Sequence, residues 1–239
     1  MKHAARPDRE NATSTPRDSA ARGFIGWLRE VGIVVGLALV ISFLVKTFLL
    51  QAFYIPSESM EQTLLRGDRV IVNKIGASKV NRGDIVVFTD PSNWLGSHSA
   101  SNQSGGFLNT VLTFIGVLPQ DDGEHLIKRV VGVGGDNVAC CDEEGRLTVN
   151  GTALDETYLA PGSIPHTIEF ETTVPDGYLW VMGDNRSHSG DSRMHQGDPG
   201  GGAVSEERVV GIAFVRVWPL DRMGILKQPS EVFSAVESQ

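Results

Sequence analysis

The chain has 239 residues, of which 41% are apolar, and this share is enough for a packed core, which excludes a wholly disordered protein. Two cysteines exclude a disulfide-dense scaffold, a pI near 5.2 argues against nucleic-acid binding, and a mean hydropathy of −0.08 excludes a polytopic membrane protein. The formal net charge of −8 is unevenly spread, since residues 1–30 carry +2 and the remaining residues carry −10. A short basic arm therefore precedes an acidic body.

The first predicted element is a membrane helix. Residues 31–45 form an uncharged run rich in Leu and β-branched residues, and the apolar character continues with two interruptions through residues 47–55. A buried core helix would show a polar stripe, which this run lacks. A cleaved signal peptide would need a small residue where the bulky Leu50 stands. We therefore expect an uncleaved signal-anchor over residues 23–50.

The flanks of this helix predict its orientation. Residues 1–22 are rich in Ser, Thr, Pro, Arg and Ala, a composition typical of disorder. Because basic flanks stay in the cytoplasm, we expect a disordered cytoplasmic tail over these residues and a body exported across the plasma membrane.

The exported body is predicted to be a β protein. Short β-rich runs broken by Gly, Pro, Asp and Asn follow the membrane segment, without repeated βα alternation. Their spacing predicts a mainly β fold, an antiparallel sheet or barrel-like domain with one N-terminal transmembrane helix. The candidate strands are Arg69–Asn73, Asp84–Thr89, Leu126–Val133, Asn137–Cys141, Arg146–Val149, Tyr178–Met182 and Val209–Trp218.

Residues 91–123 interrupt the strand pattern and are predicted to be a variable insertion. Residues 91–106 form a Ser-, Asn- and Gly-rich loop of a length that is uncommon in a compact domain. Residues 107–118 are an apolar run too short to span a bilayer. This run fits a core strand or helix and an interfacial segment equally well, and both interpretations stay open.

Patterns typical of metal and cofactor sites are incomplete. His-Glu-x-x-His and Gly-x-Ser-x-Gly are absent, and two cysteines are too few for a structural zinc site. Residues 184–190 begin like a calcium loop, but Arg186 and His188 stand where oxygen ligands are needed. We expect no metal and no cofactor.

A serine pair and a basic pair stand in unusual settings. Ser57 and Ser59 flank one residue after Pro56, directly beyond the membrane segment. Lys128 and Arg129 lie in a strand whose two faces are both apolar, so strand parity leaves open which base is buried. Arg stays charged, whereas a desolvated Lys can lose its proton and become a base. Spacing alone favours the alternative, a surface pair on an edge strand.

A third cluster follows the predicted strand over residues 178–182. The loop over residues 184–193 contains two Asp, two Arg, one Asn and three Ser. This density of polar residues favours a hydrogen-bonded network that supports a site, and a solvated turn is the alternative.

In this order after one membrane segment, the three clusters together resemble bacterial type I signal peptidase, the leader peptidase family with a Ser–Lys dyad. The resemblance extends from Val31 to Trp218, and the order of the motifs makes it specific. The motifs are Pro56-Ser-Glu-Ser-Met60, Arg66-Gly67-Asp68, Lys128-Arg129-x-x-Gly132-x-x-Gly135-Asp136, Met182-Gly-Asp-Asn-Arg186 and Ser189-x-Asp191-Ser192-Arg193.

The resemblance implies a role for each matching catalytic residue. Ser59 would be the nucleophile and Lys128 the general base. The Ser57 hydroxyl and the Ser59 N–H would form the oxyanion hole, and Ser189 would orient the Lys. A solvated Lys with a pKa of ~10.4 is no base at neutral pH, so this assignment requires burial to lower the pKa of Lys128 to ~7.

The resemblance also implies supporting and substrate-binding residues. An ion pair would support the site, with a second acid and base nearby: Asp191, Arg193, Asp184 and Arg186. Shallow pockets for small side chains would be lined by Phe53, Ile55, Leu64 and Ile127. One departure lies close to the nucleophile, since Gln62 stands where the family frequently has Pro.

The domain organisation follows the same resemblance. The exported catalytic β domain is expected over residues 51–136 and 176–232. The family's second, smaller domain would lie between these parts, and only residues 137–175 fill that space, so a reduced subdomain is expected there.

The resemblance implies a membrane-bound serine endopeptidase that removes signal peptides, cutting after small residues at −3 and −1 in an Ala-x-Ala-like pattern. Its partners would be secretory preproteins and membrane lipid, with no nucleic acid and no metal. A catalytically inactive membrane-tethered β scaffold and a Ser–Lys self-cleaving repressor are the alternatives.

The two cysteines, Cys140 and Cys141, are adjacent. Cα atoms across a trans peptide bond lie ~3.8 Å apart, below the ~4.4 Å minimum that is usual for a disulfide. We therefore expect two free thiols, or one cysteine packed in the sheet.

Overall fold

The computed structural model describes residues 16–96, 125–162 and 168–237, and the chain divides into two units, residues 1–44 and residues 45–239. Most of helix α1 (Pro16–Phe48) belongs to the first unit. Among the described residues, Gly26–Val45 is the one helical stretch long and apolar enough to cross a membrane, with a mean hydropathy of 2.2. Twenty helical residues rise about 30 Å, which matches a hydrocarbon core.

Helix α1 differs from the predicted membrane segment at both ends. It begins at Pro16, so residues 16–22, predicted to be disordered, are helical. The reason is that a nucleated helix extends easily and Pro fits its first position. It ends at Phe48, and the predicted apolar extension beyond it forms strand β1 (Leu50–Tyr54), which buries Phe53 in the sheet.

One antiparallel sheet of eight strands dominates the second unit. Its order is β1-β2-β11-β3-β4-β9-β10, with β12 paired to β11. The strands after β1 are β2 (Arg69–Asn73), β3 (Ile85–Thr89), β4 (His125–Val133), β9 (Tyr178–Met182), β10 (Val204–Ser205), β11 (Val209–Trp218) and β12 (Gly224–Ile225). Strand β11 therefore joins the pair β1–β2 to the group β3–β4–β9.

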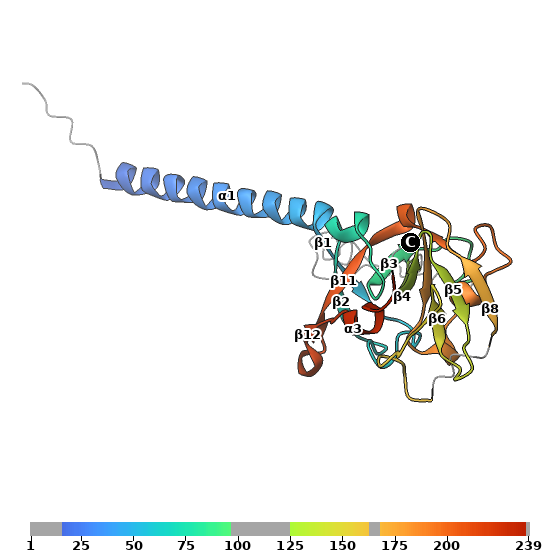
Figure 1. The fold of residues 1–239 in the computed structure, drawn as a ribbon. Coiled ribbons are helices and arrows are strands. Elements are labelled where there is room, and N and C mark those ends of the chain that lie inside the picture. The colour runs from blue at the N-terminus through green and yellow to red at the C-terminus, as the bar shows by residue number, and fades with distance from the viewer. Residues whose placement is uncertain (1–15, 97–124, 163–167, 238–239) are drawn as a thin grey trace, which may run out of the picture. The chain divides into compact units, whose positions relative to one another are not determined.

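A second antiparallel sheet has four strands in the order β7-β6-β5-β8. Its strands are β5 (Asn137–Cys140), β6 (Leu147–Val149), β7 (Thr152–Ala153) and β8 (Phe170–Thr173). Figure 1 shows β5, β6 and β8 as neighbours, and all four strands lie within the range 137–175. The short helices are η1 (Ile75–Ser78), η3 (Arg186–His188), η4 (Ser192–Met194), η5 (Glu206–Arg208), η6 (Leu220–Arg222) and α3 (Ser230–Phe233).

The two sheets share an apolar core. Val131 and Trp180 of the large sheet and Val138 of the small sheet belong to one buried cluster, which the C-terminal Phe233 completes. Gly132 on β4 allows the close approach, because a Cβ there would lie 2.6 Å from a methyl group of Val138. The small sheet is thus packed against the strand that carries Lys128.

All the candidate strands are confirmed to within about one residue of their bounds, and the mainly antiparallel β fold is confirmed with them. The sequence missed β1, which was treated only as an apolar extension of the membrane segment, and the short strands β7, β8, β10 and β12. The apolar run over residues 107–118 lies outside the described residues, and so does most of the predicted insertion.

Cys140 and Cys141 form a disulfide, so the prediction of free thiols is wrong. The peptide bond between the two residues is cis, and their Cα atoms lie 3.0 Å apart.

Candidate active site

Ser59 and Lys128 meet in the interior of the second unit, although they are 69 residues apart in the chain. Ser59 lies in the turn that follows β1, and Lys128 lies in the middle of β4. The Lys128 Nζ is 2.7 Å from the Ser59 Oγ, and the two residues are 4% and 5% exposed. A buried amine therefore faces a buried hydroxyl at hydrogen-bond distance.

Burial lowers the pKa of Lys128 from its ordinary value of 10.5 to about 8. The nearby carboxylates of Asp191 and Asp184 act in the opposite direction, and Arg193 acts with burial. The pKa of Lys128 stays above the ~7 expected from the sequence, because these two carboxylates stabilise the protonated form of Lys128. With a pKa of about 8, roughly a tenth of the Lys128 side chains are neutral at pH 7.

Ser57 adds a second hydroxyl beside Ser59. The two Oγ atoms are 3.2 Å apart, and Ser57 is exposed whereas Ser59 is buried. The Ser57 hydroxyl therefore lies at the rim of the site, within reach of an incoming carbonyl oxygen.

Arg129, which follows Lys128 on β4, is 1% exposed and is held by several acceptors. Its Nε and Nη2 donate to the two carboxylate oxygens of Asp184 at 2.8 and 2.6 Å, and its Nη1 donates to the Gly83 carbonyl at 2.8 Å. Thr63 also donates its hydroxyl to Asp184, at 2.5 Å. Because β4 is an interior strand, the surface pair that spacing alone favours is wrong.

Asp191 and Arg193 form a buried ion pair, with the Arg193 Nε 2.9 Å from the Asp191 Oδ1. The other oxygen of Asp191 accepts a hydrogen bond from the Gly183 N–H at 3.0 Å. Although burial opposes it, the hydrogen bonds from Arg193 hold the pKa of Asp191 below its ordinary value. This carboxylate therefore stays charged at neutral pH.

Asp184 and Arg186 have separate partners. Asp184 binds Arg129, while both terminal nitrogens of Arg186 donate to Glu156, with the Nη1–Oε2 distance at 2.9 Å. The Arg186 Nε donates to the Gly183 carbonyl at 3.0 Å. Sequence reasoning missed Glu156 because no motif surrounds it. A count gives no signal either, since the motifs hold four arginines and four aspartates.

Ser189 is buried close to Ser59, but its Oγ has no hydrogen-bond partner among the described residues. Its implied contact with Lys128 is therefore not formed in this structure. A Cβ on Gly183 would collide with the Ser189 hydroxyl and with the Ser59 carbonyl oxygen. The glycine thus lets Ser189 approach the backbone of Ser59.

The residues expected to line the substrate pockets belong to one buried apolar cluster: Phe53, Ile55, Leu64 and Ile127. The Phe53 ring lies 5.2 Å from the His125 ring, so the end of β1 faces the start of β4. Strand β9 pairs with β4 only from Arg129 onward, and residues 126–128 of β4 pair with β3.

Gln62, three residues after Ser59, has a φ of 86°. Pro holds φ near −65°, so the Pro that the resemblance leads us to expect could not follow this backbone path. The loop after Ser59 therefore takes a conformation of its own in this chain.

The arrangement fits nucleophilic acyl transfer. An amine of lowered pKa and a second hydroxyl both lie within 3.2 Å of the Ser59 hydroxyl. Among the described residues, no group of three or more His, Cys, Asp or Glu side chains could hold a metal ion.

Comparison with known proteins finds one family of peptidases. The family model described as signal peptidase, peptidase S26, matches residues 27–218. A probable signal peptidase I of Mycobacterium leprae is 39% identical over 228 residues, which cover 82% of this chain and 78% of the relative. The signal peptidase I of Mycobacterium tuberculosis strain H37Rv is 39% identical over 224 residues, which cover 84% and 76%.

One solved structure is also similar. The crystal structure of a signal peptidase I from Enterococcus faecalis V583 is 27% identical in sequence. The match covers 56% of this chain and 96% of that chain, with a TM-score of 0.35.

Proposed function

This chain belongs to the signal peptidase family, peptidase S26, and is a serine peptidase that removes signal peptides; we propose that it does so with Ser59 as nucleophile and Lys128 as general base. The observation that carries the proposal is the buried contact of 2.7 Å between the Lys128 Nζ and the Ser59 Oγ. A Ser hydroxyl is a weak nucleophile until a base takes its proton. The neutral amine of Lys128 is within reach of that proton.

In the acylation step, the Lys128 amine takes the proton of Ser59 as its Oγ bonds to the carbonyl carbon of the substrate residue at −1. The carbonyl electron pair moves onto oxygen, where the Ser57 O–H and the Ser59 N–H stabilise it. The C–N bond then breaks, and the Lys128 ammonium gives its proton to the leaving amine. The mature protein departs with a free N-terminus, and an ester remains on Ser59.

In the deacylation step, water gives a proton to Lys128 and bonds to the ester carbon. Ser59 leaves as the alkoxide and takes the proton back from Lys128, which releases the signal peptide as an acid. Because neutral Lys128 begins both steps, kcat/KM should rise about tenfold per pH unit as pH approaches 8 from below.

The substrate is proposed to bind as an extended segment between β1 and β4. Strand β1 stands at one end of the strand order, and β4 at Ile127 and Lys128 is paired with β3 and not with β9. Extended peptides commonly add to such strand edges. Leu64 and Ile127 are only 0% and 8% exposed, so the apolar wall offers little accessible surface, which supports small, Ala-like residues at −3 and −1.

The membrane helix is proposed to hold the N-terminus in the cytoplasm and the catalytic unit outside the plasma membrane. The net charge of +2 over residues 1–30 supports this orientation. Strand β1 begins at Leu50, just after α1 ends at Phe48, so the tether to the membrane is short. Such a tether raises the effective concentration of membrane-bound preproteins and signal peptides.

The test is cleavage of one labelled preprotein with an Ala-x-Ala site by the full-length chain in detergent. Wild type and Ser234→Ala, a control whose hydroxyl donates within the C-terminal turn, should release the mature protein at similar rates. Ser59→Ala should release none, and a preprotein with Phe at −1 should stay uncut by wild type. Equal cleavage by Ser59→Ala and wild type would refute the proposal.

A further inference from the structure

A segment of the small-sheet region lies against the loop that carries Asp184 and Arg186. Residues 154–160 follow β7, and the Ala160 N–H donates to the Asp184 carbonyl oxygen at 3.1 Å. Glu156 of the same segment accepts hydrogen bonds from both terminal nitrogens of Arg186. The side chains of this ion pair are 1% and 3% exposed, so solvent is excluded from it.

Tyr158 links this ion pair to a second arginine. Its hydroxyl donates to the Glu156 Oε1 at 2.6 Å, and the Arg129 guanidinium carbon lies 4.2 Å from the centre of its ring. Burial raises the pKa of Tyr158 well above its ordinary value, so the phenol keeps its proton and remains a donor. The segment therefore contacts one active-site arginine through a carboxylate and another through an aromatic face.

Arg186 in turn holds the backbone next to the nucleophile. Its Nε donates to the Gly183 carbonyl at 3.0 Å, and its own carbonyl accepts from the Arg193 Nη2 at 2.8 Å. The Asn185 N–H, one residue before Arg186, donates to the Ser59 carbonyl at 3.1 Å. Asn185 is therefore the single residue between Arg186 and the hydrogen bond to Ser59, so a shift of Arg186 would also shift Ser59.

Glu156 also completes the charge balance of the buried cluster. Each arginine of the cluster is paired with one carboxylate, in the pairs Arg129–Asp184, Arg186–Glu156 and Arg193–Asp191. When Lys128 is protonated, it therefore adds one positive charge in excess of these three pairs. Without Glu156 the cluster carries an unmatched guanidinium on Arg186, which interacts with Asp191, the carboxylate that stabilises the ammonium form of Lys128.

We propose that Glu156 is a positioning residue of the active site: through Arg186 it fixes the backbone around Ser59, and its charge sets how readily Lys128 gives up a proton. The proposal rests on the proposed function, because it assigns Glu156 to the reaction of Ser59 and Lys128. It also gives the small sheet a direct part in that reaction.

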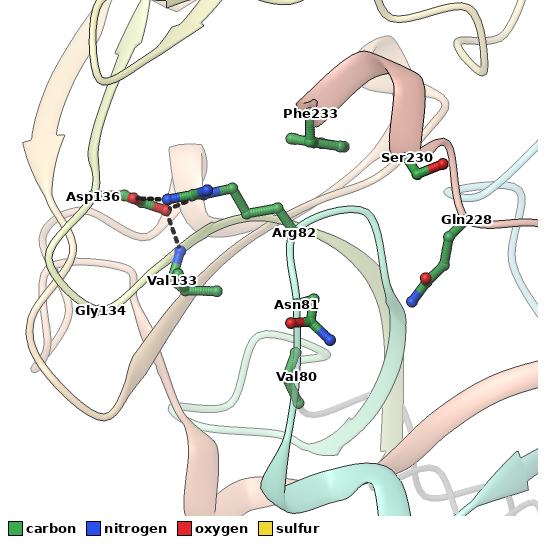
Figure 2. A pocket seen from close by; sticks show the side chains of 9 residues that line it. All are labelled: Val80, Asn81, Arg82, Val133, Gly134, Asp136, Gln228, Ser230 and Phe233. Carbon is green, nitrogen blue, oxygen red and sulfur yellow. Dashed lines mark hydrogen bonds and ion pairs between the residues drawn. The ribbon is translucent and has the colours of Figure 1, made fainter. Parts of the chain in front are cut away.

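The test compares Glu156→Gln with Asp136→Asn in the full-length chain. Figure 2 shows the control pair, in which Arg82 donates to both oxygens of Asp136. The two carboxylates are matched, since both accept a forked arginine and their side chains are 3% and 2% exposed. Asp136 also binds the Val133 N–H and the Asn150 amide, and neither belongs to the Ser59–Lys128 site.

Glu156→Gln should lower kcat about ten- to a hundredfold with little change in KM, because a misplaced nucleophile slows chemistry more than binding. The acid limb of its kcat/KM profile should move to lower pH. Asp136→Asn should lose stability but keep the wild-type kcat and acid limb. The double variant Glu156→Gln/Arg186→Gln removes both charges and should bring the acid limb back.

Wild-type kcat and a wild-type acid limb in Glu156→Gln would overturn the proposal, and so would equal kinetic effects in Glu156→Gln and Asp136→Asn. If Glu156→Gln folds poorly, Tyr158→Phe serves instead, since it keeps the ring over Arg129 and removes one hydrogen bond to Glu156. Its kcat should fall in the same direction by less, and unchanged kinetics would again overturn the proposal. Ser59→Ala, assayed in parallel, reports separately on the proposed function.

Discussion

Lys128 and Arg129 are neighbours on β4 and point to opposite faces of the strand, and each face buries its cation in a different way. The Arg129 face supplies the Asp184 carboxylate, the Gly83 carbonyl and the Tyr158 ring. Although burial opposes it, Asp184 raises the pKa of Arg129. The Lys128 face supplies the Ser59 hydroxyl, and burial lowers the pKa of Lys128 to about 8.

The difference between the two faces teaches what turns a buried cation into a base. The two residues are buried to a similar degree, since Lys128 is 4% exposed and Arg129 is 1% exposed. In the described part of the chain, no carboxylate lies within hydrogen-bond distance of the Lys128 amine, whereas the guanidinium of Arg129 is bound by both oxygens of Asp184. Burial without a bonded counter-charge destabilises the protonated form, and that is what makes Lys128 suited to proton transfer.

Lys128→Arg breaks this comparison most completely, because it places a permanent charge on both faces of β4. We expect kcat/KM to fall about a hundred- to ten-thousandfold, since Arg cannot give up its proton to act as a base. Precursor cleavage measured between about pH 6 and about pH 10 checks this, because a higher pH should not restore activity. A variant that regains activity as pH rises would contradict the assignment of Lys128.

Asp184→Asn breaks the comparison from the other face by leaving Arg129 charged and poorly paired. The free energy of unfolding should fall by about 3–5 kcal/mol, as when one partner of a buried ion pair is removed. Denaturant unfolding of the protein in detergent measures it. The control is Asp142→Asn, which removes the partner of Arg146, whose side chain is 42% exposed, and should change stability little. Equal losses would show that Arg129 does not depend on its carboxylate.

Lys128→Met sharpens the comparison, because it should stabilise the protein while abolishing cleavage. The unfolded chain holds the Lys128 proton up to a pKa of 10.5 and the folded chain only up to about 8, so stability rises with pH between these values. The penalty for burying the ammonium is fully present below pH 8 and absent above 10.5. At about 1.4 kcal/mol per pKa unit, the variant should gain up to about 3 kcal/mol at neutral pH.

The pH dependence of that gain is the decisive part of the measurement. The stability difference between Lys128→Met and wild type should shrink as pH rises and vanish above the unfolded pKa of 10.5. A difference that is constant with pH would mean that packing, and not the buried charge, separates the two proteins.

Local patterns account for what the sequence predicted well. The apolar run around Lys128 predicted β4, and the spacing of Ser57, Ser59 and the later polar loop carried the family resemblance. Strand β8 (Phe170–Thr173) escaped prediction, because its four residues hold two Thr and a Glu and form a strand through pairing with β5. A short strand of this kind depends on its neighbour more than on its own sequence.

The network around the site depended on tertiary structure and could not be predicted from local patterns. Whether Arg129 is buried follows from the interior place of β4 in the sheet order, which no local pattern reveals. Glu156 finds Arg186 across 30 residues of chain, and Tyr158 meets Arg129 only because the two sheets share a core. The family motifs pointed to Ser59 and Lys128 as the proposed reacting groups, and the tertiary structure added Glu156 and Tyr158, which no motif contains.

The place of β11 in the large sheet determines when during synthesis the sheet can be completed. Ser59 follows β1, which pairs with β2, while Lys128 lies on β4, which pairs with β3, and β11 is the strand that bridges these two pairs. It comes late in the chain, so a growing polypeptide completes this sheet only after Val209–Trp218 has emerged. Ser59 and Lys128 therefore stay unassembled through most of synthesis, which delays the proposed catalytic contact until most of the chain has emerged.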